Sequence, residues 1–333
     1  MTTRLQVRDL RVTFDTDEGP VLAVNGVSFD VAAGEVLALV GESGCGKSMT
    51  AMSLMGLLPP TATRTGSLQL EGRELATLRP RDMREIRGRD ISMIFQEPMT
   101  SLNPVFTVGY QIGEVLRRHE GMNRKQARAR AVELLDLVRI PAPERRVDEY
   151  PHQMSGGMRQ RVMIAMAVAC NPKVLLADEP TTALDVTIQA QILDIMRDLR
   201  QALDTSIVII THDLGVVADI AERVVVMYAG HVVETGSVED VFARPQHPYT
   251  LGLLGSVPRP DQVLLDGQDR LAEIPGIVPT LRSEPEECVF APRCPRATQG
   301  CREAMPALAT TAPGQEAACI HPGPAPAHAE VTV

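Results

Sequence analysis

A glycine-rich motif of the form G-x-x-x-x-G-K-S, at residues 41–48, constrains this chain more than any other feature. It follows the apolar run at residues 35–40 and precedes the helix-like segment 49–58. This order predicts a strand, a phosphate-binding loop and a helix, because glycine-rich backbone can turn its N–H groups toward phosphate oxygens. Lys47 is then expected to reach the β- and γ-phosphates, and Ser48 to offer its hydroxyl to Mg²⁺. We therefore predict nucleoside triphosphate binding rather than a glycine-rich turn without a ligand.

Length and charge narrow the class of protein. At 333 residues the chain can bury one large core and carry an appendage, or form two domains. A formal charge of −9 argues against broad nucleic-acid binding, although a local basic patch would escape this test. No apolar run approaches the ~18 to 20 residues that span a bilayer, and the polar start lacks the apolar core of a signal peptide. A cytosolic protein is expected.

Strands and helices alternate along most of the chain. Alternating apolar residues at 5–14 and the segment 21–29 predict an antiparallel β layer, in which Phe14 is either an adenine-stacking aromatic or ordinary core. The segments 91–95, 174–177, 207–210 and 224–227 read as buried strands separated by helices. This pattern predicts an α/β sheet with ligands at one edge.

Residues 98–150 are helical in pattern rather than strand-like. Apolar residues recur at helical spacing between Asn123, a plausible cap, and Ile140, before a stop at Pro141. We interpret the segment as an inserted helical subdomain. Its arginines, among them Arg124, Arg128 and Arg130, are expected to form a solvated face rather than a ligand site.

Polar residues stand at the ends of the predicted strands. Gln96 can bind Mg²⁺ or the attacking water, Asp178 can hold Mg²⁺ through water, and Glu179 can polarise the attacking water. His212 can contact the γ-phosphate. The segment Ser155-Gly156-Gly157 opens a helix, so it forms either a second anion site or an ordinary helix cap.

In order and spacing, these motifs resemble the ATP-binding subunit of ABC transporters from residue 1 to about residue 235. The resemblance identifies residues 41–48 as Walker A, Gln96 as the Q-loop, residues 155–157 as the ABC signature, Val174 to Asp178 as Walker B, Glu179 as the catalytic glutamate, Ala183-Leu184-Asp185 as the D-loop and His212 as the switch histidine. Two departures are visible. Met154 and Met158 flank the signature in place of the common leucine and glutamine, and an acidic insertion at residues 15–19 displaces the adenine-stacking aromatic.

The resemblance implies a fold and a set of functional residues. The expected fold is an α/β P-loop NTPase core of ABC type with an antiparallel β layer at residues 1–96 and 160–235, an inserted helical subdomain at 97–159, and a cysteine-containing extension at 236–333. Catalysis is expected from Glu179, His212 and Gln96, and Mg²⁺ binding from Ser48, Gln96 and Asp178. ATP contacts are expected from Phe14, Gly41, Ser43, Gly44, Cys45, Gly46, Lys47, Ser48, Met49, Ser155, Gly156, Gly157 and Asp185.

Three further stretches narrow the resemblance to the ATPases of dipeptide and oligopeptide importers: residues 96–104, residues 185–191 and His247-Pro248-Tyr249-Thr250. That group implies two ATPase subunits meeting head to tail, each ATP lying between one subunit's Walker A and the other's signature. It also implies a related second ATPase as heterodimer partner, two membrane permease subunits, an extracytoplasmic solute-binding protein and a place on the cytoplasmic face of the membrane.

Peptides are the expected solute, although nickel, glutathione and sugar importers share this type of ATPase. A soluble ABC ATPase acting on nucleic acid is the alternative from another class. The absence of sustained heptads and of a second phosphate loop disfavours it.

Four of the six cysteines, Cys288, Cys294, Cys301 and Cys319, fall in the proline-rich extension, with five, six and seventeen residues between successive members. In a reducing compartment this crowding suggests a metal rather than disulfides. Zinc sites favour closer pairs of the C-x₂-C kind. Similar tails in importer ATPases resemble iron–sulfur sites, so a 4Fe-4S cluster is expected, with zinc as the alternative. Cys45 lies in the phosphate loop and Cys170 in a predicted helix, so both are excluded from the metal site.

Overall fold

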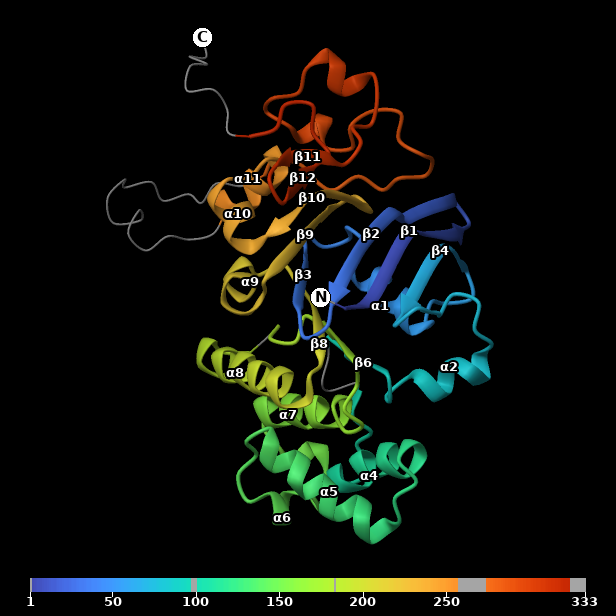
Figure 1. Ribbon diagram of the computed structural model, residues 1–333, viewed down its shortest axis with the longest axis vertical. Coiled ribbons are helices and arrows are strands. Elements are labelled where there is room, and N and C mark those ends of the chain that lie inside the picture. Colours follow the sequence, from blue (N-terminus) through green and yellow to red (C-terminus); the bar gives the residue numbers. More distant parts are fainter. Residues whose placement is uncertain (1, 97–100, 183, 257–273, 324–333) are drawn as a thin grey trace, which may run out of the picture.

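The computed structural model of the protein describes residues 2–96, 101–182, 184–256 and 274–323. Two β sheets occupy the middle of an elongated molecule, with a helical region at one end and the C-terminal extension at the other (Figure 1). The larger sheet has the strand order β11-β12-β10-β9-β3-β8-β7-β6. Its parallel part comprises β3 (Val36–Val40), β6 (Ile91–Ile94), β7 (Val174–Asp178), β8 (Ser206–Thr211) and β9 (Arg223–Tyr228).

The smaller sheet is antiparallel and has the order β2-β1-β4-β5. It is built from β1 (Thr3–Thr16), β2 (Gly19–Ala32), β4 (Ala62–Leu70) and β5 (Arg73–Glu74). The alternation in residues 5–14 therefore does mark a half-buried antiparallel strand. The predicted β layer is confirmed.

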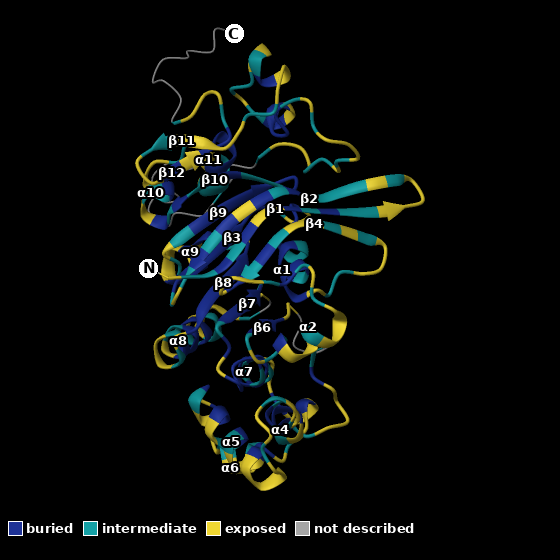
Figure 2. Cartoon of the chain, turned by 45° about the vertical axis from the view of Figure 1, so that its right-hand side comes forward, coloured by how far each residue is buried: buried dark blue, intermediate teal, exposed yellow. Residues whose placement is uncertain are grey.

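Strand β3 separates two hydrophobic cores. Val36, Ala38 and Val40 point into the core shared with the helices, whereas Leu37 and Leu39 point into the core shared with the antiparallel sheet. Because both faces of the strand are covered, its sequence is a continuous apolar run rather than an alternating one. Figure 2 shows this burial along β3 and its neighbours. The first residue after such a strand is thereby fixed at the edge of the sheet.

The helices follow the expected order, with some differences at their ends. Helix α1 (Lys47–Met55) ends at Gly56, which has φ 59°, three residues before the prolines where the sequence predicts its end. Among the described residues before the extension, the other helices are α2 (Pro80–Ile86), α4 (Val108–His119), α5 (Arg124–Leu137), α6 (Pro143–Arg146), the 3₁₀ turn η1 (Pro151–Gln153), α7 (Gly156–Ala167), α8 (Val186–Leu203) and α9 (Leu214–Ile220).

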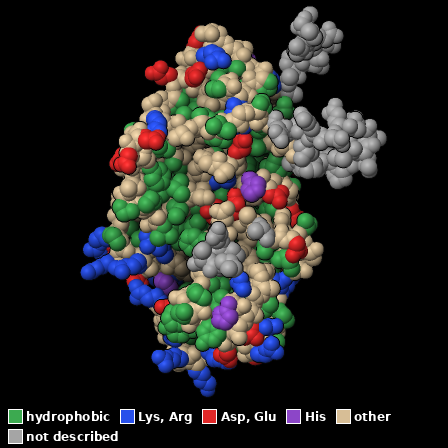
Figure 3. Space-filling model, turned by 180° about the vertical axis from the view of Figure 1, so that it is seen from behind, with side chains coloured by type: hydrophobic (Ala, Val, Ile, Leu, Met, Phe, Trp, Pro, Cys, Tyr) green, Lys and Arg blue, Asp and Glu red, His purple; other side chains and the backbone are tan. Residues whose placement is uncertain are grey.

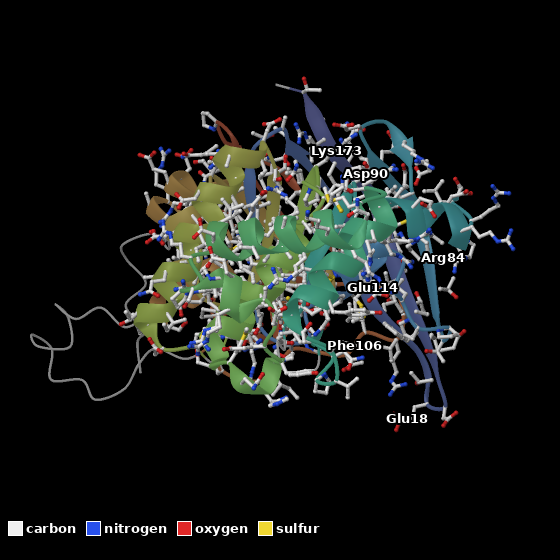
Figure 4. All side chains as sticks on the ribbon, turned by 90° about the horizontal axis from the view of Figure 1, so that it is seen from below. Glu18, Arg84, Asp90, Phe106, Glu114 and Lys173 are labelled. Atoms are coloured by element: carbon white, nitrogen blue, oxygen red, sulfur yellow. The ribbon has the colours of Figure 1, made fainter. Side chains whose placement is uncertain are left out.

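The inserted helical region follows β6, the strand at one edge of the larger sheet. Asn123 caps α5 with a reciprocal pair of hydrogen bonds to Gln126, as its position before the periodic segment predicts. Arg124 and Arg128 are exposed, and Figure 3 shows lysine and arginine side chains gathered around this end of the molecule. Viewed from below, Asp90 and Lys173 lie together where β6 and β7 begin (Figure 4), and the Lys173 N–H donates to the Asp90 carbonyl at 2.9 Å.

The described part of the extension contains more regular structure than its proline-rich sequence suggests. Strand β12 (Gln315–Ala317) pairs with β10 (His231–Ser237), and β11 (Ala309–Ala312) pairs with β12, so these strands lengthen the main sheet. The extension's described residues also form α10 (Val238–Ala243), α11 (Pro248–Gly255) and the 3₁₀ turns η2 (Ala291–Arg293) and η3 (Gln299–Arg302). Within the described ranges, no helix is both long and apolar enough to span a bilayer.

Candidate functional site

The glycine-rich motif forms the loop between β3 and α1. Gly41 has φ 151°, and a Cβ atom there would lie 2.2 Å from the Met227 carbonyl oxygen. Gly46 has φ 100°, and a Cβ atom there would lie 2.4 Å from the Ala23 carbonyl oxygen. Backbone approaches this close exclude any side chain, so both glycines are required for the shape of the loop. The loop opens onto the N-terminus of α1, where free N–H groups and the helix dipole favour an anion.

Lys47 is folded into this loop. Its ammonium donates to the Gly41 carbonyl at 2.7 Å and to the Glu42 carbonyl at 2.9 Å, and only 6% of the residue is exposed. Cys45 is fully buried, and burial raises the pKa of its thiol although Lys47 lies nearby. A buried Cys45 with a raised pKa is suited to packing rather than to metal binding.

Ser48 and Asp178, both predicted to bind Mg²⁺, are neighbours. The Ser48 hydroxyl donates to Asp178 Oδ1 at 3.1 Å. Asp178 ends β7, and burial raises the pKa of its carboxyl, as does the adjacent Glu179, while the hydrogen bond from Ser48 opposes both. A buried carboxylate with a raised pKa favours a cation as its partner. The arrangement therefore offers two oxygen ligands of the kind that Mg²⁺ prefers.

Glu179 lies at the centre of the predicted catalytic residues. Gln96 Nε2 donates to its Oε2 at 3.0 Å, and His212 Nδ1 lies 3.1 Å from its Oε1. Thr182 also donates to Oε2, at 2.8 Å. Burial disfavours the carboxylate, but the hydrogen bonds from Thr182 and His212 outweigh that effect and lower the pKa of Glu179. The residue is thus held ionised, as a proton acceptor must be.

Sequence reasoning missed Thr182. The only sequence signal for Thr182 is its hydroxyl three positions after Glu179. A turn of that length can bring the hydroxyl back to the Glu179 carboxylate. Glu179 itself has φ 47°, an uncommon conformation for a residue with a side chain. Thr182 therefore fixes a carboxylate whose backbone is already in an unusual conformation.

The signature segment lies apart from the phosphate loop of its own chain. Ser155 caps α7, and its hydroxyl accepts from the Met158 N–H at 3.3 Å. The segment lines an open cavity of about 460 Å³ together with Asp185, whose carboxylate caps α8. No residue of the phosphate loop lines this cavity. Ala183 of the predicted D-loop and residues 97–100 lie outside the described residues.

Phe14 lies on β1 opposite Val21 of β2. It is half-buried and packs against the core of the antiparallel sheet. The Phe14 ring therefore has a packing role in this sheet, and its stacking on adenine stays a prediction.

The four cysteines of the extension converge on one cavity, which Cys288, Cys294, Cys301 and Cys319 line together. Its free space is about 10 Å³, roughly that of one water-sized probe. Burial raises the pKa of the Cys288, Cys294 and Cys319 thiols. Among the described residues, no group of three or more His, Cys, Asp or Glu is arranged to hold a metal ion. The predicted 4Fe-4S cluster is therefore not supported by the arrangement of these side chains.

The sequence is similar to that of known ATP-binding proteins of transporters. Residues 24–182 match the family model for ABC transporters, and residues 233–301 match the model for the C-terminal region of oligopeptide/dipeptide transporters. The chain is 56% identical over 317 residues to a probable peptide ABC transporter ATP-binding protein, y4tR, of Sinorhizobium fredii, covering 95% of this chain and 94% of that one. It is 53% identical to the oligopeptide transport ATP-binding protein AppD of Bacillus subtilis, covering 96% and 97%.

A solved structure shows the same architecture. The ATP-binding cassette MJ0796, in a dimeric post-hydrolysis state bound to ADP and phosphate, superposes with a TM-score of 0.63 at 29% identity, covering 70% of this chain and 98% of that one. The chain belongs to the family of ABC transporter ATP-binding proteins. It is an ATPase of the ABC type, whose cofactors are ATP and Mg²⁺.

Proposed function

We propose that this ATPase drives the import of peptides through separate membrane-spanning subunits. The single observation that carries the proposal is the match of residues 233–301 to the C-terminal region of oligopeptide/dipeptide transporters, a region beyond the general ATPase motifs. The relatives named above, at 53 to 56% identity, are peptide transport ATP-binding proteins by name. Nickel, glutathione and sugars are the rival solutes. A soluble ABC ATPase acting on nucleic acid is the remote alternative, and the formal charge of −9 disfavours it.

The proposed roles at the ATP site follow from its contacts. The N–H groups of the phosphate loop and the Lys47 ammonium bind the triphosphate, while Ser48, Asp178 and Gln96 are the candidate ligands of Mg²⁺. A bound Mg²⁺ ion neutralises charge on the phosphate oxygens. Glu179 orients the attacking water and accepts its proton, and His212 holds the carboxylate from one side.

The proposed active unit is a dimer of ATPase subunits. Its support is the separation of the signature cavity from the phosphate loop within one chain, and the dimeric state of the related cassette. Ser155, Gly156, Gly157 and Asp185 would face the nucleotide bound by the other subunit, which we propose is a related but different ATPase. An isolated chain should then be a poor ATPase. A rate that matched the full complex and did not depend on protein concentration would contradict the dimer.

The remaining partners are two permease subunits and an extracytoplasmic solute-binding protein, which place this subunit at the cytoplasmic face of the membrane. The experiment is to purify the chain with its partner ATPase and permeases, reconstitute them in vesicles with the solute-binding protein, and measure ATP-dependent uptake. A mixed di- to pentapeptide pool should be taken up, and Ni²⁺, glutathione and a disaccharide serve as matched competitors. Uptake of one of these instead of peptides would overturn the choice of solute.

We also propose that the four cysteines of the extension bind a 4Fe-4S cluster, with Zn²⁺ as the rival. The support is their common cavity, and binding would require the cavity to open. Anaerobic purification should give a brown protein containing iron, and Cys301→Ser should lose the colour. A colourless chain with neither iron nor zinc would contradict any metal at this site.

A further inference from the structure

The C-terminal extension contacts the phosphate loop through Arg293, the last residue of η2. Its guanidinium forms two parallel bonds to the carboxylate of Glu42, the second residue of the loop: Nη1 to Oε2 at 2.7 Å and Nη2 to Oε1 at 3.0 Å. Only 5% of the Arg293 side chain is exposed, against 30% of Glu42. A bidentate pair with one partner this deeply buried is stronger and more directional than a surface ion pair.

The Arg293 guanidinium is also held from the side of the extension. Its Nε donates to the Pro275 carbonyl at 2.8 Å, and Nη2 donates to the Ile274 carbonyl at 3.0 Å. Nη1 additionally lies 3.4 Å from the Tyr228 hydroxyl. The planar fork is therefore fixed by contacts on several edges, which a lysine ammonium cannot reproduce.

A second group from the extension reaches the same loop residue. The Tyr249 hydroxyl of α11 accepts from the Glu42 N–H at 2.8 Å. The Tyr249 ring packs against Tyr228 and Phe290, with centroids 4.7 and 5.4 Å away, so the hydroxyl is rigidly placed. Burial raises the pKa of the Tyr249 phenol, so it stays neutral at working pH.

Glu42 links these contacts to the phosphate site. Its carboxylate is bound by Arg293 and its N–H by Tyr249, while its carbonyl accepts from the Lys47 ammonium. Resting on the proposed ATP site, we infer that Arg293 and Tyr249 are positioning residues that hold the phosphate loop through Glu42, so that the extension sets the affinity for ATP. A loop that is already ordered loses less entropy when ATP binds, so its affinity for the triphosphate is higher.

The test is a double-mutant cycle on the full chain with a fluorescent ATP analogue and Mg²⁺ as the probe. Arg293→Gln and Glu42→Gln should each raise the Kd about tenfold, and the double variant should be no weaker than either single one, because both remove the same contact. Tyr249→Phe, which removes one oxygen, should raise the Kd by about threefold. Arg302→Gln is the matched control, since its 4.0 Å pair with Glu287 is exposed.

Several outcomes would overturn the inference. A Kd unchanged in all three single variants, or additive effects in the double variant, would mean that the extension does not position the loop. Should Arg293→Gln fail to fold, Glu42→Gln and Tyr249→Phe still decide, because both keep the bonds from Arg293 to the Pro275 and Ile274 carbonyls. Binding to the unmodified chain separates the two proposals: its absence would overturn the ATP site and this inference together, whereas its presence with equally tight variants would overturn the inference alone.

Discussion

His212 Nδ1 lies 3.1 Å from Glu179 Oε1, which joins the residue after β8 to the residue after β7 across the edge of the parallel sheet. The other carboxylate oxygen accepts from Gln96, the second residue after β6. Three strand ends are thus connected through one carboxylate. This connection places the proposed proton acceptor between a histidine and an amide, both of which are exposed.

Removing the histidine tests this arrangement. His212→Ala should lower the ATPase rate of the assembled transporter about 10²-fold, because Glu179 loses one of the groups that orient it. ATP binding to the isolated chain should change by no more than about threefold, since His212 does not touch the phosphate loop. Steady-state ATPase assays and equilibrium titration measure the two quantities. A parallel loss of binding and turnover would show that the histidine acts on the loop instead.

Replacing Lys47, unlike His212, should weaken the binding of ATP itself. Lys47→Ala removes the ammonium and its two bonds to loop carbonyls, so the Kd for MgATP should rise about 10- to 100-fold. Lys125→Ala, on the exposed start of α5, is the matched control and should leave the Kd unchanged. Unaltered ATP affinity in Lys47→Ala would rule out the phosphate loop as the triphosphate site.

Much of the fold could be predicted from local sequence, because its elements carry strong patterns. The run at residues 174–178 is uniformly apolar up to Asp178 and is buried throughout, and Asn123 caps α5 where its spacing predicts. The ends of parallel strands lie at one sheet edge, so Asp178, Glu179 and His212 could be expected to lie near one another.

The contacts of the extension could not be predicted in this way. Glu42 and Arg293 are 251 positions apart, and neither stands in a periodic segment that would reveal its partner. Strands β11 and β12 have four and three residues, too few to show an alternation. The crowding of four cysteines predicted a metal. The structure brings all four to one cavity, but among the described residues it arranges no group of three or more candidate ligands around an ion.

Stability of the helical region should depend on its own core. Leu134→Ala, at a fully buried position of α5, should lower the free energy of unfolding by about 2 to 5 kcal/mol through lost burial and a cavity. Arg124→Ala, exposed on the same helix, should change it by less than about 0.5 kcal/mol. Urea unfolding monitored by circular dichroism checks both. Equal effects of the two substitutions would contradict the burial of this helix face.

Glu179→Gln tests the central claim most directly. The amide keeps the size of the side chain but cannot accept a proton from water, so ATP should still bind while turnover falls by about 10³-fold or more. The measurement is single-turnover ATP hydrolysis by the assembled transporter, with the partner subunit's own site inactivated. The account predicts bound, uncleaved ATP in a closed dimer of subunits. Hydrolysis at the unmodified rate would contradict it.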